Sequence, residues 1–99
     1  MNPNPVALVT GATSGFGLET ARLLSQKGYQ VYGSYRNPKK LSELKRIPSV
    51  NPVYLDVTRN SSIKKAVSAI LRKEGRIDVL VNNAEFAMAG FLEDLSDQD

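Results

Sequence analysis

The sequence predicts an α/β domain built on a parallel sheet, because strand-like and helix-like segments alternate along its 99 residues. Short apolar runs such as Val6-Ala7-Leu8-Val9 are typical of strands that are buried on both faces. A glycine-rich stretch, residues 10–17, separates this first run from the first helical pattern. These observations favour crossover helices that cover both faces of the sheet.

The first half of the chain predicts two strands, a helix between them and a short helix after them. The first strand is Val6–Val9, and a helix from about Phe16 to Lys27 follows the glycine stretch, with Gly28 placed to end it. We expect Gly17, Ala21 and Leu24 to form the stripe of this helix that faces the sheet. Gln30 to Tyr35 is the second strand. Asn37-Pro38 then has the form of a helix start, so a short helix through Leu41 and Leu44 should end before Pro48.

The second half predicts two further strands around an amphipathic helix. Val53–Leu55 is the third strand, and Ile77 to Val81 is the fourth. Between them, Gly75 should end a helix whose apolar residues recur at helical spacing: Ile63, Ala66, Val67, Ile70 and Leu71. The tail, Ser96 to Asp99, resembles a capping box, which normally precedes a helix, so we expect this sequence to be the front part of a longer domain.

Composition excludes several function classes. The chain has no cysteine and no histidine, which excludes disulfides, thiolate chemistry, the usual zinc ligands and Ser-His-Asp or Cys-His catalysis. We expect no metal site, no membrane-spanning segment and no signal peptide, and a reducing, cytoplasmic setting fits. The net charge of +3 arises from basic clusters such as Lys39-Lys40 and Lys64-Lys65. We interpret these clusters as solvated helix faces; nucleic-acid binding is the alternative, but no motif supports it.

The glycine stretch has the residues that a dinucleotide diphosphate requires. Gly11 permits a tight turn off the strand, Gly15 removes a side chain where backbone approaches the phosphates, and Gly17 permits close packing of helix and sheet. The start of the helix offers unpaired N–H groups, and the hydroxyls of Thr13 and Ser14 add donors, with Phe16 in the first turn. No Gly-Lys-Ser/Thr follows, which excludes a Walker loop.

Three motifs together resemble the short-chain dehydrogenase/reductase family. They are Thr-Gly-x-x-x-Gly-x-Gly in residues 10–17, Asp56-Val57 after the third strand, and Asn82-Asn83-Ala84 after the fourth. The resemblance implies a three-layer Rossmann-type half over residues 1–99, with strand order 3-2-1-4. It also implies cofactor contacts from Asp56, Val57, Asn83 and Ala84, and a mainly structural role for Asn82. The alternatives are that Asp56 caps the turn at Thr58 and that the asparagines satisfy loop backbone.

The end of the second strand indicates which cofactor would be preferred. An NAD enzyme places an acidic residue there to bind the ribose 2′-hydroxyl, whereas this chain has Tyr35 and then Arg36. A guanidinium can bind a 2′-phosphate, and Lys39 and Lys40 could assist, so NADP is favoured over NAD. The alternative is that Arg36 only faces solvent at the start of a loop.

Two departures from the family pattern limit what the chain can do. Glu85 stands where the family has glycine, and at about 6 Å from a phosphate its charge would cost ~3 kcal/mol, on the order of a hundredfold in affinity, unless it turns into solvent. The family's catalytic Tyr-x-x-x-Lys pair lies beyond the fourth strand, where this sequence has neither tyrosine nor lysine. Tyr35 and Lys39 have the same spacing but lie at the end of the second strand, so no catalytic residue is assigned and we expect the chain alone to be inactive. The resemblance implies a part of an NADP(H)-dependent oxidoreductase of carbonyl or alcohol substrates.

One alternative is a module that binds the nucleotide without turnover. Another is an interaction module, because the fourth strand would lie at an open edge and could pair with a second copy or a complementing chain.

Overall fold

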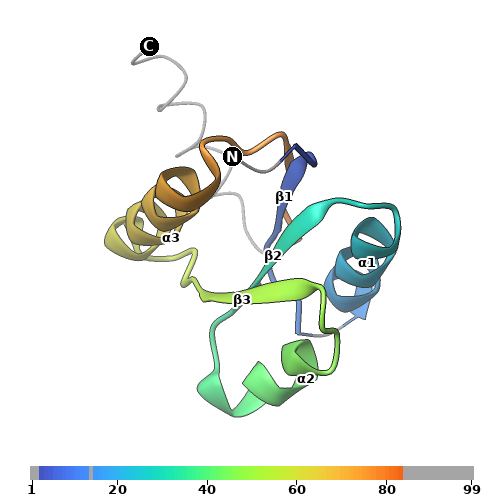
Figure 1. The fold of residues 1–99 in the computed structure, drawn as a ribbon. Coiled ribbons are helices and arrows are strands. Elements are labelled where there is room, and N and C mark those ends of the chain that lie inside the picture. Colours follow the sequence, from blue (N-terminus) through green and yellow to red (C-terminus); the bar gives the residue numbers. More distant parts are fainter. Residues whose placement is uncertain (1–2, 14, 84–99) are drawn as a thin grey trace.

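A computed structural model describes residues 3–13 and 15–83, and it confirms the predicted α/β fold (Figure 1). Four parallel strands form one sheet in the order β3-β2-β1-β4, as the sequence predicts. Two crossover connections extend the sheet from β1 through β2 to β3, and a third returns past β1 to β4. The strands are β1 (Val6–Val9), β2 (Gln30–Tyr35), β3 (Val50–Tyr54) and β4 (Val79–Val81).

Helices cover both faces of the sheet, which gives the three layers expected. The helix α1 (Gly15–Gln26) and the short α2 (Leu41–Lys45) lie on one face, and α3 (Asn60–Glu74) lies on the other. A 3₁₀ turn, η1 (Pro38–Lys40), precedes α2, and the Asn37 side chain caps it by accepting a hydrogen bond from the Lys39 amide at 3.0 Å. No helix in the described part of the chain is long and apolar enough to cross a lipid bilayer.

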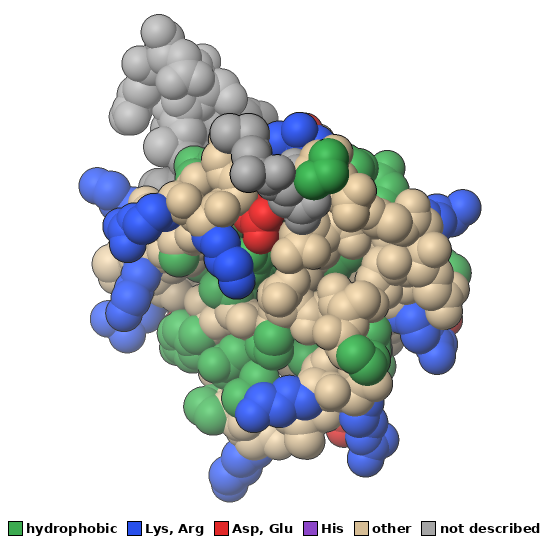
Figure 2. All heavy atoms as spheres, viewed as in Figure 1, with side chains coloured by type: hydrophobic (Ala, Val, Ile, Leu, Met, Phe, Trp, Pro, Cys, Tyr) green, Lys and Arg blue, Asp and Glu red, His purple; other side chains and the backbone are tan. Residues whose placement is uncertain are grey.

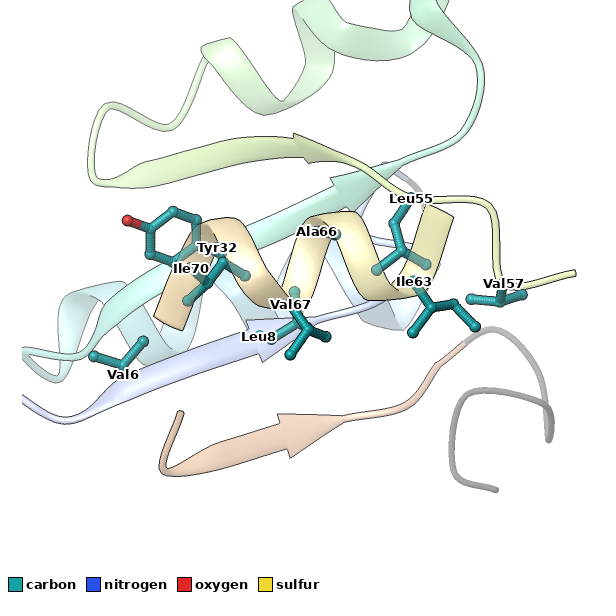
Figure 3. Packing of buried hydrophobic residues seen from close by; sticks show 9 residues of the cluster. All are labelled: Val6, Leu8, Tyr32, Leu55, Val57, Ile63, Ala66, Val67 and Ile70. Carbon is teal, nitrogen blue, oxygen red and sulfur yellow. The ribbon is translucent and has the colours of Figure 1, made fainter. Parts of the chain in front are cut away.

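Every residue of β1 is buried, because its side chains alternate between the two apolar layers. Val6 and Leu8 face α3, and Ala7 and Val9 face α1 and α2. Figure 3 shows the layer beneath α3, in which the helix lays its apolar stripe over the sheet. That layer consists of Val6, Leu8, Tyr32, Leu55, Val57, Ile63, Ala66, Val67 and Ile70.

The structure corrects the bounds of two strands. The third strand begins at Val50, three residues earlier than predicted, and contains Pro52. Proline has no N–H to donate, but β3 pairs with β2 alone among the described strands, so Pro52 sits at an edge where no donor is needed. The fourth strand begins at Val79 instead of Ile77. Just before it, the Asp78 carboxylate takes the place of a backbone carbonyl of a neighbouring strand, because it accepts the hydrogen bond of the Val6 amide at 2.7 Å.

The predicted stripe of α3 is wrong at one position. Leu71 is 42% exposed, whereas Ile70 is 1% exposed and fills the core. The buried face continues instead to Glu74, whose carboxylate accepts a hydrogen bond from the Tyr32 hydroxyl at 2.5 Å. Burial, followed by the bond and the charge of Glu74, raises the pKa of Tyr32 to about 12. Gly75 ends the helix in a left-handed conformation, as predicted.

Candidate functional site

A tight turn leads from the end of β1 into α1 and places the glycines as the sequence predicts. Gly11 and Gly15 adopt φ values of 60° and 56°, a left-handed region that favours glycine. The helix begins at Gly15, so its first amide groups, which have no partner within the helix, are directed at the mouth of the turn. Gly15 and Phe16 are exposed there, and Ser14 lies outside the described residues.

Gly17 lies where the turn and the helix come closest together. A Cβ added to Gly17 would lie 2.1 Å from the carbonyl oxygen of Gly11 and 2.8 Å from the side-chain nitrogen of Asn83. Both distances are shorter than van der Waals contact, so only glycine fits. The predicted role of Gly17, close packing of the helix, is therefore visible in the geometry.

The asparagine pair after β4 holds the glycine turn from the other side. The Thr10 hydroxyl accepts a hydrogen bond from the Asn83 amide at 2.9 Å, and the Asn83 side chain donates to the Gly11 carbonyl at 3.3 Å. The Thr10 hydroxyl also lies 3.3 Å from the side-chain oxygen of Asn82. Thus Asn82 and Asn83 both contact the residues that directly follow β1, Thr10 and Gly11. Ala84 and Glu85, which the sequence placed beside the cofactor, lie outside the described residues.

A hollow of about 450 Å³ opens beside the glycine turn, at the carboxyl ends of β2 and β3. Buried side chains of Ser34, Leu55 and Val57 line its inner part. None of the described residues that line it carries a carboxylate, and three of them have basic or amide side chains that are exposed at the rim. The lining residues are Gly11, Thr13, Ser34, Tyr35, Arg36, Asn37, Lys40, Leu55 and Val57.

Arg36 and Asp56 project from neighbouring strand ends, next to the hollow. Arg36 is largely exposed, and its Nε lies 3.8 Å from Oδ2 of Asp56. The other carboxylate oxygen accepts hydrogen bonds from the Thr58 hydroxyl at 2.6 Å and the Thr58 amide at 3.0 Å. These bonds, together with the charges of Arg36 and Arg59, hold the pKa of Asp56 below its ordinary value. The turn-capping role of Asp56 is present, and one oxygen remains turned towards Arg36.

The face of the molecule in Figure 2 carries Lys and Arg side chains around its periphery. Apolar side chains gather between α3 and β3, where Val53, Tyr54 and Ala69 line a second, shallower hollow of about 400 Å³. The described residues contain no group of three or more acidic side chains that could hold a metal ion.

Sequence reasoning named Arg36, Lys40, Thr13 and Val57 but missed the contribution of Ser34. A serine near the end of the apolar second strand was the one available signal. Ser34 is 2% exposed and accepts a hydrogen bond from the Gly11 amide at 3.0 Å. Only the pairing of β1 with β2 reveals that contact.

A glycine turn that joins the first strand to a helix, with a hollow at the carboxyl ends of parallel strands, defines a Rossmann-type α/β domain. The family model described as short chain dehydrogenase matches residues 5–99. The chain belongs to the short-chain dehydrogenase family.

Curated relatives and a solved structure agree with this assignment. The chain is 43% identical over 88 residues to 3-ketodihydrosphingosine reductase of Bacteroides thetaiotaomicron, covering 89% of this chain and 31% of that protein. It is 37% identical over 99 residues to the 3-oxoacyl-[acyl-carrier-protein] reductase FabG of Thermotoga maritima, covering 95% and 40%. The crystal structure of actinorhodin polyketide ketoreductase with NADPH matches at a TM-score of 0.77 and 41% identity, covering 82% of this chain and 33% of that one. The chain therefore spans between three and four tenths of the length of these relatives.

Proposed function

We propose that the chain binds a nicotinamide dinucleotide, NADP(H) in preference to NAD(H), as the cofactor-binding part of an oxidoreductase of carbonyl or alcohol substrates. The observation that carries the proposal is the hollow beside the glycine turn, which Arg36 and Lys40 line and to which residues 3–13 and 15–83 contribute no carboxylate. A 2′-phosphate would gain charge-assisted hydrogen bonds from these side chains. A carboxylate that would repel it, or bind a 2′-hydroxyl in its place, is missing from that lining.

The diphosphate would bind at the glycine turn. Gly11, Thr13, Ser14, Gly15, Phe16 and Gly17 form or flank this turn, and a Cβ at Gly15 would extend into open space with no neighbour within 4 Å. The unpaired amides of the first turn of α1 and the helix dipole would stabilise the negative charge. Nothing in the described turn opposes an anion, since α1 has no acidic residue in its first turn.

The adenosine would occupy the inner part of the hollow, between the ends of β2 and β3. Asp56 and Val57 would contact the base, and Arg36 would contact the 2′-phosphate. Asn83 and Ala84 would flank the nicotinamide side, beyond the end of β4. The bound nicotinamide would supply or accept the hydride. The relatives named above are reductases, which supports a carbonyl or alcohol substrate.

No tyrosine or lysine follows β4 in the 99 residues, and the one Tyr-x-x-x-Lys spacing, Tyr35 to Lys39, lies at the end of β2 on the proposed adenosine side of the site. Proton transfer to a substrate oxygen therefore has no candidate in these residues. We propose that the chain by itself binds cofactor without turnover. Calorimetry with NADP and NAD tests the binding, and an assay of NADPH oxidation with a panel of ketones tests the absence of turnover. Tighter binding of NADP and no oxidation are expected. Absence of binding to either nucleotide would refute the first claim, and steady oxidation would refute the second.

A second candidate function is assembly through β4. Among the described strands β4 pairs with β1 alone, and its three residues, Val79, Leu80 and Val81, are only half-buried although all are apolar. An open apolar edge can pair with another copy of the chain or with a complementing chain. Light scattering at several concentrations tests this candidate: growth in mass with concentration supports it, and a monomer at all concentrations contradicts it.

A further inference from the structure

We infer that Ser34 is a positioning residue that anchors the glycine turn to β2, so that binding of a diphosphate depends on a side chain two residues before Arg36. This inference rests on the proposed function and extends it to a residue that no motif includes. Ser34 belongs to β2, whereas the glycine turn follows β1, so the anchor couples two separate segments of the site.

Two adjacent hydrogen bonds make the anchor. The Gly11 amide donates to the Ser34 hydroxyl at 3.0 Å, and the Ala12 amide donates to the Ser34 carbonyl at 2.9 Å. The regular register of β1 and β2 ends at the pair Val9 and Gly33, just before these contacts. The anchor therefore continues the contact between the two strands into the first residues of the turn, where ordinary strand pairing has stopped.

The side-chain bond constrains the part of the turn whose conformation is most demanding. Gly11 has a positive φ of 60°, and its carbonyl oxygen is the atom that a Cβ at Gly17 of α1 would approach most closely. The Asn83 side chain donates to that carbonyl from the β4 side at 3.3 Å. Gly11 is thus held through its N–H by β2 and through its C=O by the segment after β4. The N–H belongs to the peptide unit between Thr10 and Gly11, and the C=O to the one between Gly11 and Ala12. Loss of either bond should let the peptide unit that it holds rotate, and the amides of the turn would then no longer converge.

Burial makes the bond at Ser34 difficult to replace. The Ser34 side chain is 2% exposed, and neighbouring residues of the hollow are the buried Leu55 and Val57. If the hydroxyl is removed, the Gly11 amide loses its protein partner, and a water molecule from the adjoining hollow would have to take its place. The hydroxyl lines the hollow without itself reaching the rim, where Arg36 and Lys40 lie exposed.

The test compares Ser34→Ala with the parent chain and with Ser68→Ala, which removes an exposed hydroxyl on α3. Two probes are titrated by calorimetry: NADP, which contains the diphosphate, and 2′-AMP, which has the adenosine and the 2′-phosphate but no diphosphate. Ser34→Ala should weaken NADP by about fivefold, the loss typical of one neutral hydrogen bond. It should weaken 2′-AMP by a smaller factor, because Ser34 also lines the adenosine part of the hollow but 2′-AMP makes no use of the glycine turn. Ser68→Ala should change neither. An equal loss for both probes, or unchanged NADP affinity, would overturn the inference.

A second readout does not depend on the cofactor. In the ¹⁵N-labelled chain without nucleotide, Ser34→Ala should accelerate hydrogen exchange of the Gly11 amide, while the Ala12 amide, which donates to backbone, stays protected. Unchanged exchange at Gly11 would show that Ser34 is no anchor. If Ser34→Ala accelerates exchange at Gly11 but the parent chain binds no NADP, the anchor is upheld and the proposed function is refuted.

An isosteric pair covers the case in which Ser34→Ala does not fold. Ser34→Thr and Ser34→Val add the same bulk and differ only in the hydroxyl. The threonine variant should bind NADP about fivefold more tightly than the valine variant. Equal affinities would contradict the anchor.

Discussion

Replacing Gly17 by alanine tests the close approach on which the glycine turn is built. In the middle of an ordinary helix this change stabilises a protein by up to ~1 kcal/mol, because alanine has the higher helix propensity. At Gly17 the same change should instead destabilise the protein. The new Cβ would lie 2.1 Å from the Gly11 carbonyl oxygen and 2.8 Å from both the Gly11 carbonyl carbon and the Asn83 side-chain nitrogen.

The size of the effect follows from these contacts. Two of the three atoms are backbone, so relief requires that α1 or the turn move by about 1 Å, and such overpacking costs ~1–3 kcal/mol. The bond from Asn83 to the Gly11 carbonyl would be strained or lost, which adds ~1 kcal/mol. After subtraction of the propensity gain, we expect the free energy of unfolding to fall by ~1–3 kcal/mol.

Urea denaturation of Gly17→Ala measures this loss, and calorimetry of the same variant measures NADP binding. Gly28→Ala is the matched control, because its φ of 93° is strained for alanine but its Cβ would meet no atom within 4 Å. The control should lose stability and keep its NADP affinity, whereas Gly17→Ala should lose both. A Gly17→Ala chain that is as stable as the parent and binds NADP equally well would refute the reasoning.

Three further outcomes are expected. In calorimetry, Arg36→Gln should weaken NADP binding by about 10- to 100-fold and leave NAD binding unchanged, because one charge-assisted hydrogen bond contributes ~1.5–3 kcal/mol. Arg22→Gln, on α1 and outside the hollow, should change neither affinity. Ile70→Ala should lower the free energy of unfolding in urea by ~2–5 kcal/mol, whereas Leu71→Ala, at a 42% exposed site, should cost under ~1 kcal/mol; equal losses would contradict the assigned core. The pKa of Tyr32 is raised from 10.0 to about 12, so the folded state binds this proton more tightly than the unfolded state. The resulting contribution to the free energy of unfolding, ~3 kcal/mol at most, is fully present below pH 10.0 and is lost towards pH 12. In urea denaturation at several pH values, Tyr32→Phe should remove this part of the pH dependence.

Local patterns predicted the elements well because each depends on neighbouring residues. The glycine turn, the cap at Asn37 and the left-handed end of α3 at Gly75 all follow from side-chain size and local hydrogen bonding. The strand order also followed, since the crossover rules and the family resemblance leave one arrangement.

What the sequence did not predict depends on contacts between distant segments. Position 74 continues the helical spacing of Ile70, but its charge would place a glutamate outside; Glu74 is buried because the Tyr32 hydroxyl, 42 residues away, donates to it. Periodicity placed Leu71 inside, although it is exposed. The third strand includes Pro52 because it lies at an edge, which only the assembled sheet determines. Ser34 likewise shows its role only when β1 and β2 are paired.

A titration of the ¹⁵N-labelled chain with NADP, followed through its backbone amide signals, tests the central claim most directly. The account predicts saturable shifts at Gly11, Thr13, Arg36 and Val57, which belong to three separate segments around one hollow. Shifts confined to another surface, such as the groove that Arg22 and Arg46 line, or no shifts at millimolar NADP, would contradict it.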